Sequence, residues 1–210
     1  MLMPTLNTIC LYRMMHIDNV PHLFRFGITH KSSPNANPYY VPIGDSSLIS
    51  TRATFPIPLK GDWGTLGDYI PFYFGVRMPM LYVIQHGGNF VPNAVSPKDI
   101  VYVAVSLQSF LSTGQKYCFT DGHATDAFTG FYDVSRINDL PKIVCWDSVV
   151  AEFWKDTAVK RQKQAEFLIM GDIAPQHIRG YVCYNVETKE KLVNMGVDKA
   201  IIKVCPKAYY

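Results

Sequence analysis

Prolines and glycines crowd one long stretch of this 210-residue chain, residues 31–68, and this stretch sets the strongest limit on its fold. Proline fixes φ and lacks an amide donor, and glycine weakens helices and strands. The segment therefore predicts a loop that cannot be regular for long. A loop of that length inside a compact domain is usually functional or disordered. The residues concerned are Pro34, Pro38, Pro42, Gly44, Pro56, Pro58, Gly61, Gly64 and Gly67.

Short strands and short helices are expected on both sides of this loop. Residues 8–16 predict a first strand, followed by a helix over residues 19–26 that Asp18 caps and Gly27 ends. Residues 100–107 (IVYVAVSL) form a short apolar run typical of a buried strand. Other expected elements are strand-like segments at 69–84, 165–169, 180–187 and 200–205, a loop at 118–132, and a helix capped by Asp147 that buries Val149, Val150, Phe153 and Trp154.

Strands separated by long loops, with few long helices, predict an α+β fold. The length fits a single domain over residues 1–210. Hydrophobic residues make up 48% of the chain and charged residues 18%, a globular composition that can close a core. The net charge of +3 predicts no strong field over the whole protein, so any contact with nucleic acid needs a local basic patch.

Composition and signals also limit the class of protein. The cysteine count of 5 is odd and no pair has a CxxC spacing, which argues against a disulfide framework and a zinc site, and no metal is expected. The first ten residues lack the pattern of a signal peptide. Arg77 and two prolines interrupt the most apolar stretch, residues 69–84, so no membrane helix is expected. These observations predict a soluble, cytoplasmic protein.

Several familiar catalytic motifs are absent. The chain has no GxGxxG, GxxxxGK[ST], HExxH or GxSxG sequence, so it signals neither a Rossmann turn, a P-loop, a zinc protease nor a serine hydrolase. The glycines of residues 61–67 could cradle a phosphate, although a plain flexible loop explains them better.

Polar residues that could carry chemistry stand at the ends of expected elements. His16 ends the first strand, where its ring could donate to a ribose hydroxyl. Arg52 lies in the long loop and could hold a pyrophosphate. Glu166 begins an apolar strand just after the basic run at residues 160–163, whose cations would keep its carboxylate ionised. Each of these residues also has a purely structural interpretation. His16 could be a packed histidine, Arg52 a solvated loop charge and Glu166 a charge on an edge strand.

Taken in their order along nearly the whole chain, these pieces resemble the DarT family, toxins of bacterial toxin–antitoxin pairs that ADP-ribosylate DNA. The most specific similarities are TLGDYIPFYF at residues 65–74 with RMPMLY at 77–82, FTDGHA at 119–124 and QAEFL at 164–168. The resemblance implies the α+β fold of ADP-ribosyltransferases, in which NAD, the co-substrate, binds a cleft between two small sheets with flanking helices.

The resemblance also implies roles for particular residues. Glu166 corresponds to the catalytic glutamate, which in this enzyme class bonds the nicotinamide-side ribose and stabilises the cation formed when nicotinamide leaves. Arg52 corresponds to a loop arginine that holds the diphosphate and helps remove a proton from the target base. The expected NAD-binding residues are His16, Asn19, Gly27, Arg52 and Tyr73.

The expected acceptor is a base of single-stranded DNA, with thymine preferred and guanine an alternative. Lys160, Arg161 and Lys163 could follow its phosphates, and Tyr39 and Tyr40 could stack on its bases. By resemblance, the partner is an antitoxin of the macrodomain type. Two other functions stay open from the sequence: an ADP-ribosyltransferase that acts on RNA or protein, and a catalytically silent nucleic-acid-binding module.

Overall fold

The computed structural model describes residues 3–88, 90–91 and 93–210, and its strands form one mixed sheet. The strand order is β5-β4-β6-β2-β1-β3-β7-β8, and the β7–β8 pair is parallel whereas the other pairs are antiparallel. The strands are β1 Cys10–His16, β2 Tyr69–Tyr73, β3 Ile100–Ser106, β4 Tyr117–Thr120, β5 Phe131–Tyr132, β6 Glu166–Met170, β7 Ile178–Cys183 and β8 Ile202–Val204.

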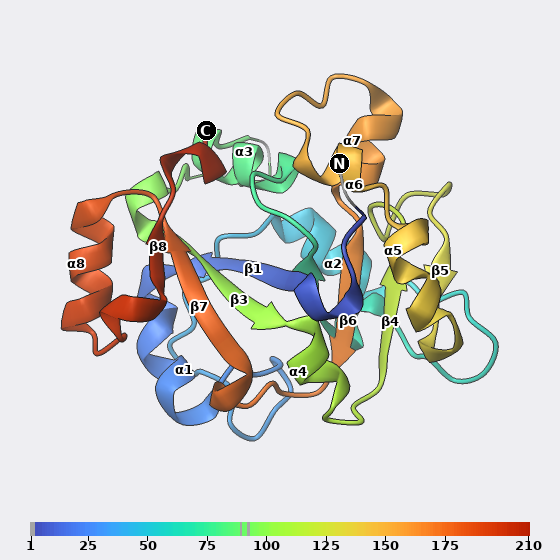
Figure 1. Ribbon diagram of the computed structural model, residues 1–210, viewed down its shortest axis with the longest axis horizontal. Coiled ribbons are helices and arrows are strands. Elements are labelled where there is room, and N and C mark those ends of the chain that lie inside the picture. The colour runs from blue at the N-terminus through green and yellow to red at the C-terminus, as the bar shows by residue number, and fades with distance from the viewer. Residues whose placement is uncertain (1–2, 89, 92) are drawn as a thin grey trace.

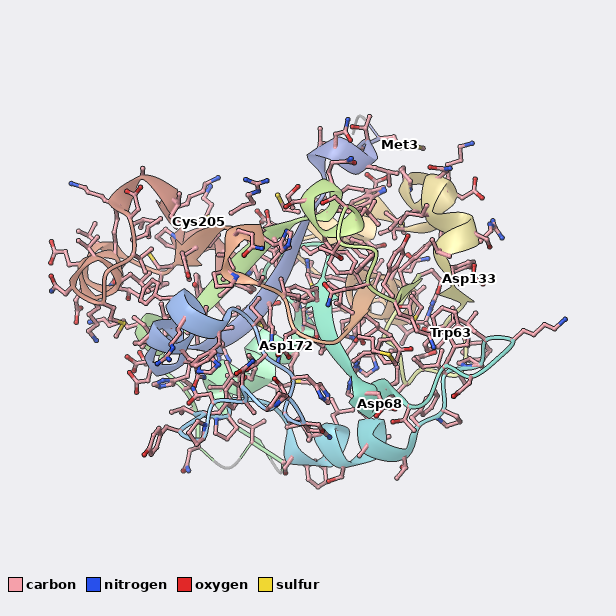
Figure 2. The ribbon with its side chains drawn as sticks, turned by 90° about the horizontal axis from the view of Figure 1, so that it is seen from below. Met3, Trp63, Asp68, Asp133, Asp172 and Cys205 are labelled. Atoms are coloured by element: carbon pink, nitrogen blue, oxygen red, sulfur yellow. The ribbon has the colours of Figure 1, made fainter. Side chains whose placement is uncertain are left out.

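Short helices cover both faces of this sheet. Figure 1 shows α4 and α5 in front of the sheet and α2 behind it, and the view from below in Figure 2 agrees. No helix in the described part of the chain is long and apolar enough to cross a membrane. The helices are α1 Val20–Phe26, α2 Ser46–Thr54, α3 Pro79–His86, α4 Leu107–Leu111, α5 Leu140–Ile143, α6 Trp146–Val150, α7 Thr157–Lys163 and α8 Val186–Asn194.

The sheet is nearly divided in two between β1 and β2. Strand β1 pairs with β3 at each of its seven residues but with β2 at one register position, Tyr12 with Tyr73. The half β1-β3-β7-β8 and the half β2-β6-β4-β5 therefore meet at a narrow junction. The mixed α+β fold is confirmed, and the two small sheets expected from the sequence are the two halves of one sheet.

Alternation of side chains along the strands separates a large core from the face that carries the junction. Ile70 and Phe72 of β2, and Phe74 just after it, point into the largest apolar cluster. Tyr73 points to the other face. Its register partner on β6 is Glu166, so both side chains emerge on the face that α2 covers. The start of β6 thus places a carboxylate beside the junction.

The predicted loop at residues 31–68 is wrong in one respect, because it contains the helix α2. Asp45 caps this helix, since its Oδ1 accepts hydrogen bonds from the amides of Ser47 and Leu48 at 2.8 and 3.0 Å. None of the residues of α2 is buried, so the sequence carries no apolar stripe that would announce the helix. Arg52 accordingly sits on a helix and not in a loop.

Three other local predictions also need correction. The strand expected over residues 69–84 ends at Tyr73, and α3 follows it from Pro79. Asp147 lies inside α6, and Phe153, expected in a buried helix face, is 81% exposed because α6 ends before it. Asp18 lies in a single 3₁₀ turn whose cap is the His16 ring, which accepts from the Asp18 amide.

Gly27 ends α1 as expected and also lets two backbones meet. It has φ +70°, a conformation that strongly favours glycine, and a Cβ there would collide with the carbonyl oxygen of Ile173. The next residue, Ile28, forms a bridge to Ile173. The requirement for glycine is therefore structural.

We expect Gly27→Ala to lower the free energy of unfolding by about 1–3 kcal/mol from backbone conformation alone, with the clash against Ile173 adding to that loss. Gly114→Ala is the matched control, because Gly114 also has φ +70° but has no atom near its missing Cβ. Urea unfolding of both variants measures the difference. Equal losses would show that the close approach at Gly27 contributes nothing.

Candidate active site

A cavity of about 400 Å³ lies beside the junction of the two half-sheets. Its walls come from β1, β2, α2, the start of α3 and the loop at residues 29–45. Arg13, Arg52 and Tyr73 bring polar atoms to it, and Tyr40 and His123 also line it. The chain therefore concentrates polar side chains from distant segments around one hollow, as small-molecule sites do.

Glu166 and Arg52 form an ion pair at the edge of this cavity. The Arg52 Nη1 atom lies 3.2 and 2.9 Å from the two carboxylate oxygens of Glu166. The side chain of Glu166 is 1% exposed and that of Arg52 is 15% exposed, so water screens the pair little. Arg52 Nη2 is buried and has no hydrogen-bond partner among the described residues. Arg52 thus holds the carboxylate and keeps a free donor group.

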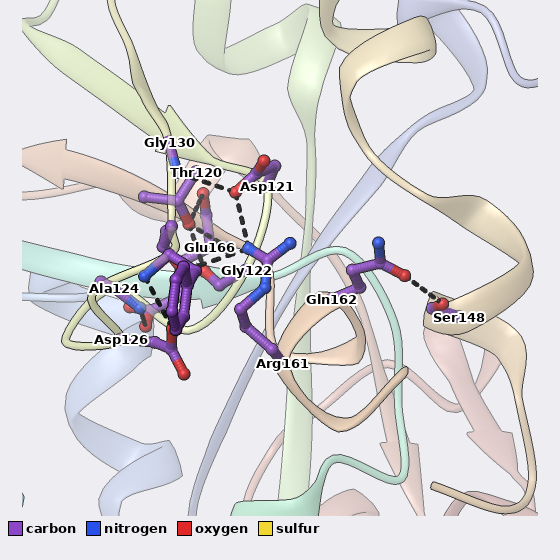
Figure 3. Close-up of polar contacts among 12 residues, drawn as sticks. Thr120, Asp121, Gly122, Ala124, Asp126, Gly130, Ser148, Arg161, Gln162 and Glu166 are labelled. Atoms are coloured by element: carbon purple, nitrogen blue, oxygen red, sulfur yellow. Dashed lines mark hydrogen bonds and ion pairs between the residues drawn. The ribbon is translucent and has the colours of Figure 1, made fainter. Parts of the chain in front are cut away.

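The loop at residues 121–130 fixes the carboxylate from its other side (Figure 3). The amide of Ala124 donates to Glu166 Oε1 at 3.1 Å. Thr120 Oγ1 accepts from the Glu166 amide at 2.9 Å and donates to the Gly122 carbonyl at 2.7 Å. Hydrogen bonds from the charged Arg52 and a neutral amide therefore set the orientation of Glu166. These contacts come from the FTDGHA segment, to which the sequence analysis assigned no role in the site.

Arg161 holds this loop against α7. Its Nη1 lies 2.9 Å from Asp121 Oδ1, and its carbonyl accepts from the His123 amide at 3.1 Å. Asp121 also accepts from the Gly130 amide at 2.9 Å, which closes the loop (Figure 3). A Cβ on Gly122 would collide with the Arg161 guanidinium, so this position requires glycine. Arg161 is a positioning residue for the loop that orients Glu166.

The opposite wall of the cavity is pinned at several points. Asp172 accepts from the His30 amide at 2.8 Å and from the Ser33 hydroxyl at 2.5 Å. The His30 ring bonds the Gly67 carbonyl at 2.9 Å. Asn19, which is 2% exposed, makes two hydrogen bonds to the backbone of Val41, at 2.8 and 2.9 Å. The long loop is therefore ordered by side chains of its neighbours.

Tyr73 brings a half-buried phenol to the same place. Burial raises the pKa of Tyr73, and the nearby Glu166 carboxylate raises it further, whereas Arg52 and Arg13 oppose this shift. The hydroxyl is therefore protonated at neutral pH. Arg13 is fixed by its own hydrogen bond to the Pro71 carbonyl at 3.0 Å.

The structure brings together some of the NAD-binding residues expected from the sequence and separates others. Arg52 and Tyr73 line the cavity, and Glu166 lies behind them, joined to Arg52 by the ion pair and to Tyr73 by strand register. Asn19 does not line the cavity; its hydrogen bonds to Val41 order the loop that does. His16 and Gly27 do not line it; His16 caps a 3₁₀ turn and Gly27 ends α1. No sequence signal pointed to the wall residue His30, because its role depends on a contact with distant Gly67.

The residues expected to contact DNA are also divided. Tyr40 lines the cavity, whereas Tyr39 is 88% exposed away from it. Lys160 is exposed, with its ammonium 5.6 Å from the centre of the Trp154 ring. The three cations do not form an exposed track, because Arg161 is paired with Asp121 and Lys163 is 2% exposed, and their contact with DNA stays a prediction. The turn from α7 into β6 carries Lys163 into the interior.

The structure thus places a buried arginine–glutamate pair beside a cavity at the junction of two half-sheets in a mixed fold. The family model described as "ssDNA thymidine ADP-ribosyltransferase, DarT" matches residues 12–210. The chain belongs to the DarT family.

Individual relatives agree with this assignment. A DNA ADP-ribosyl transferase of Escherichia coli O127:H6 is 31% identical over 186 residues, which cover 87% of this chain and 83% of the relative. A fusion of a DNA ADP-ribosyl transferase with a DNA ADP-ribosyl glycohydrolase from Thermosipho africanus is 28% identical over 93% of this chain and 47% of its own length.

The fold of DarT from Thermus sp. 2.9 is similar to that of this chain. The structure of that protein with ADP-ribosylated ssDNA superposes with a TM-score of 0.83 at 24% identity and covers 96% of both chains. The structure of the same protein with NAD⁺ gives a TM-score of 0.77 at 23% identity, covering 96% of this chain and 98% of that one. Both matches show the shared fold.

We expect Glu166→Gln and Arg52→Met each to lower the free energy of unfolding by roughly 3–5 kcal/mol, because each removes one partner of a buried ion pair. The double variant should lose less than the sum of the two, since it leaves neither charge unpaired. Urea unfolding of the four proteins measures this coupling. Additive losses would show that the two side chains do not interact.

Proposed function

We propose that this protein transfers ADP-ribose from NAD to a thymine base of single-stranded DNA. The observation that carries the proposal is the buried Glu166 carboxylate, which Arg52 and the Ala124 amide hold in one orientation beside the cavity. The description of the matched family names this reaction and this acceptor. The E. coli relative is named as a DNA ADP-ribosyl transferase.

The residues at the cavity fit a dinucleotide that carries a diphosphate and a ribose. NAD supplies an activated ribose, because its bond to a positively charged nicotinamide breaks readily. Arg52 Nη2, a buried donor without a protein partner, would meet a diphosphate oxygen. The aromatic ring of Tyr73 and the apolar wall of β2 would hold the nicotinamide. Relatives of this fold have been solved with NAD⁺, which supports this assignment.

The reaction requires a fixed negative charge near the ribose. When the bond between the ribose and nicotinamide breaks, positive charge develops at the ribose carbon. Glu166 is already paired with Arg52 and held in one orientation, so it stabilises that charge without rearrangement. The new bond forms to a nitrogen of the base, nicotinamide leaves with the electrons of the broken bond, and the proton lost from the base nitrogen passes to water. Tyr73 stays protonated and adds no second negative charge.

The acceptor follows from access to the base. In a duplex the edge that carries base pairing is occupied, so an enzyme must extrude the base or act on single strands. The cavity opens beside the loop that carries Tyr40, where a single base could enter. The structure of Thermus DarT with ADP-ribosylated ssDNA supports a single-stranded acceptor.

We further propose that the protein is the toxin of a toxin–antitoxin pair and acts in the cytoplasm, where DNA is available. Its partner would be a macrodomain-type glycohydrolase that removes the modification. The Thermosipho relative joins a transferase and a glycohydrolase in one chain, which supports this pairing.

The test is to incubate oligonucleotides with NAD and the protein and to weigh the products. Single strands with one thymine should gain the mass of one ADP-ribosyl group, and strands without thymine, matching duplexes, RNA and a bystander protein should not. If a guanine-only strand is modified, the acceptor base is guanine and not thymine. Modification of RNA or protein alone would contradict the proposed acceptor.

We expect Glu166→Gln to reduce transfer by on the order of 10²–10³-fold, because it removes a fixed charge from the transition state. Arg52→Lys should not restore wild-type transfer, since a lysine lacks the planar group that bonds Glu166 and a diphosphate together. Initial rates with a thymine-containing strand measure both. A folded Glu166→Gln variant with wild-type rates would remove the catalytic assignment.

The role of Tyr73 is tested by two substitutions. If its ring contacts nicotinamide, Tyr73→Phe should keep the KM for NAD near the wild-type value, and Tyr73→Ala should raise it about fivefold, as expected for a lost aromatic contact worth ~1 kcal/mol. Equal KM values in Tyr73→Ala and the wild type would place nicotinamide elsewhere.

A further inference from the structure

A second cavity of about 330 Å³ lies where β2 ends, between the turn at residues 74–77, α6 and the C-terminal segment. Its volume falls within the range of small-ligand sites, about 300–1,000 Å³. Tyr12 lines this cavity and its register partner Tyr73 lines the first, so the two cavities adjoin across the junction of the half-sheets. The reaction proposed above uses no residue of this second cavity.

Lys163 faces this cavity from the protein interior. It is 2% exposed, and its Nζ makes one hydrogen bond, to the Val149 carbonyl at 2.8 Å. An ammonium has three donors, so donor capacity is left over. No carboxylate in the described part of the chain forms an ion pair with it. Burial, with Arg77 nearby, lowers the pKa of Lys163 to about 8, and the group is therefore still mostly charged at neutral pH.

Arg77 faces the same cavity from the turn after β2. Its φ of +57° lies in the left-handed region that residues other than glycine seldom adopt. The Tyr102 hydroxyl accepts from its amide at 2.8 Å, and the Tyr210 hydroxyl donates to its carbonyl at 2.9 Å, which holds this conformation. Its Nε is buried and has no hydrogen-bond partner among the residues that the structure describes. A strained backbone that presents an unpartnered donor is typical of functional sites.

The charges around the cavity favour an anion. Lys207 adds a third cation to its lining, and Glu152 is the one acidic residue among the lining residues and forms no ion pair in the described structure. Gly75 lets this turn approach α6 closely, since a Cβ there would lie 2.8 Å from Val149 Cγ1. The backbone is thus built to bring Arg77 and Lys163 into one hollow.

Aromatic rings lie next to these cations. Tyr82 of α3 packs edge-to-face on Trp154 and Tyr210, with ring centres 5.8 and 5.2 Å apart, and stacks on His86 at 4.0 Å. The Arg77 guanidinium lies 4.7 Å from the centre of the Tyr210 ring. Tyr82 is 42% exposed, so the cluster reaches the surface. Proteins that hold single-stranded nucleic acid combine cations for phosphates with rings for bases.

We propose that this second cavity binds one backbone phosphate of the single-stranded DNA acceptor, with Lys163 and Arg77 as its donors and the cluster around Tyr82 beside the adjoining base. The identity of the anion as a DNA phosphate rests on the function proposed above. Lys163 then contacts DNA from within a cavity and not from an exposed track. The neighbouring first cavity would receive the base that is modified.

The test measures binding of a fluorescent single-stranded oligonucleotide by anisotropy, without NAD, over a series of salt concentrations. Lys163→Met keeps the buried volume, and Arg77→Gly relieves the left-handed strain, so both variants should fold. Each should weaken binding about tenfold or more, and each should lower the slope of log K against log salt by about 0.7, the value for one phosphate contact on a single strand. Lys203→Met, which removes one exposed lysine of β8, is the charge-matched control and should bind like the wild type.

A second experiment uses a set of oligonucleotides, in each of which one phosphate linkage, at a different position, is replaced by a neutral methylphosphonate. In the wild type one linkage should weaken binding strongly, and in Lys163→Met the same linkage should cause little further loss. Inorganic phosphate should compete with the DNA in the wild type only. Slow NAD hydrolysis in the absence of DNA should be the same in all variants, because neither residue touches the first cavity.

The outcomes separate this proposal from the one on which it rests. If Lys163→Met and Arg77→Gly bind DNA and respond to salt like the wild type, with a lower Tm alone, both residues are structural and the phosphate site is refuted. The proposal is also refuted if RNA binding depends on Lys163 and Arg77 more strongly than DNA binding does. If the oligonucleotide binds as described but no wild-type transfer occurs, the phosphate site stands and the proposed function fails.

Discussion

The buried ion pair between Arg52 and Glu166 is the interaction around which this protein is organised. Its two partners come from segments 114 residues apart, a helix inside the proline-rich region and the first residue of β6. Removing either partner would leave a charge in the interior, which proteins tolerate poorly. The Ala124 amide donates to the same carboxylate, and the Thr120 hydroxyl holds the backbone amide of Glu166.

The narrow junction in the sheet explains how the ion pair can be buried and still reach a ligand. Because β1 and β2 share one register pair, the two halves of the sheet do not close over the ends of these strands. A cavity opens on each side of the Tyr12–Tyr73 pair, one beside Glu166 and one beside Lys163. A continuous ladder between β1 and β2 would pair the backbone that now lines these hollows. The weak pairing therefore leaves room for the two cavities.

Much of the framework could be predicted from local sequence, because it depends on local patterns. The apolar run of β3 and the start of β6 follow from strand periodicity, and the stop at Gly27 follows from helix-capping chemistry. The helix α2 escaped prediction, because none of its residues is buried and prolines and glycines flank it. The strand expected from residue 69 onward was too long, because Phe74 to Met78 turn away before α3 begins.

The site was predictable in part, and for a different reason. Glu166 and Arg52 were found through resemblance to a family, since neither spacing nor composition links residues so far apart in the sequence. The role of Arg161 could not be read from a basic run, because its charge is used by Asp121, a residue 40 positions away. The burial of Lys163 likewise depends on α6 folding over it, as the hydrogen bond to Val149 shows. Side chains whose roles depend on distant partners need the tertiary structure.

We propose that NAD binds and reacts at the Arg52–Glu166 pair beside the junction of the half-sheets. A crystal structure of this protein with a non-hydrolysable NAD analogue would show whether it does. The ribose next to nicotinamide should lie within hydrogen-bond distance of Glu166, and the diphosphate should lie at Nη2 of Arg52. An analogue that lies away from both side chains, or that occupies the cavity of Lys163 and Arg77, would contradict the claim.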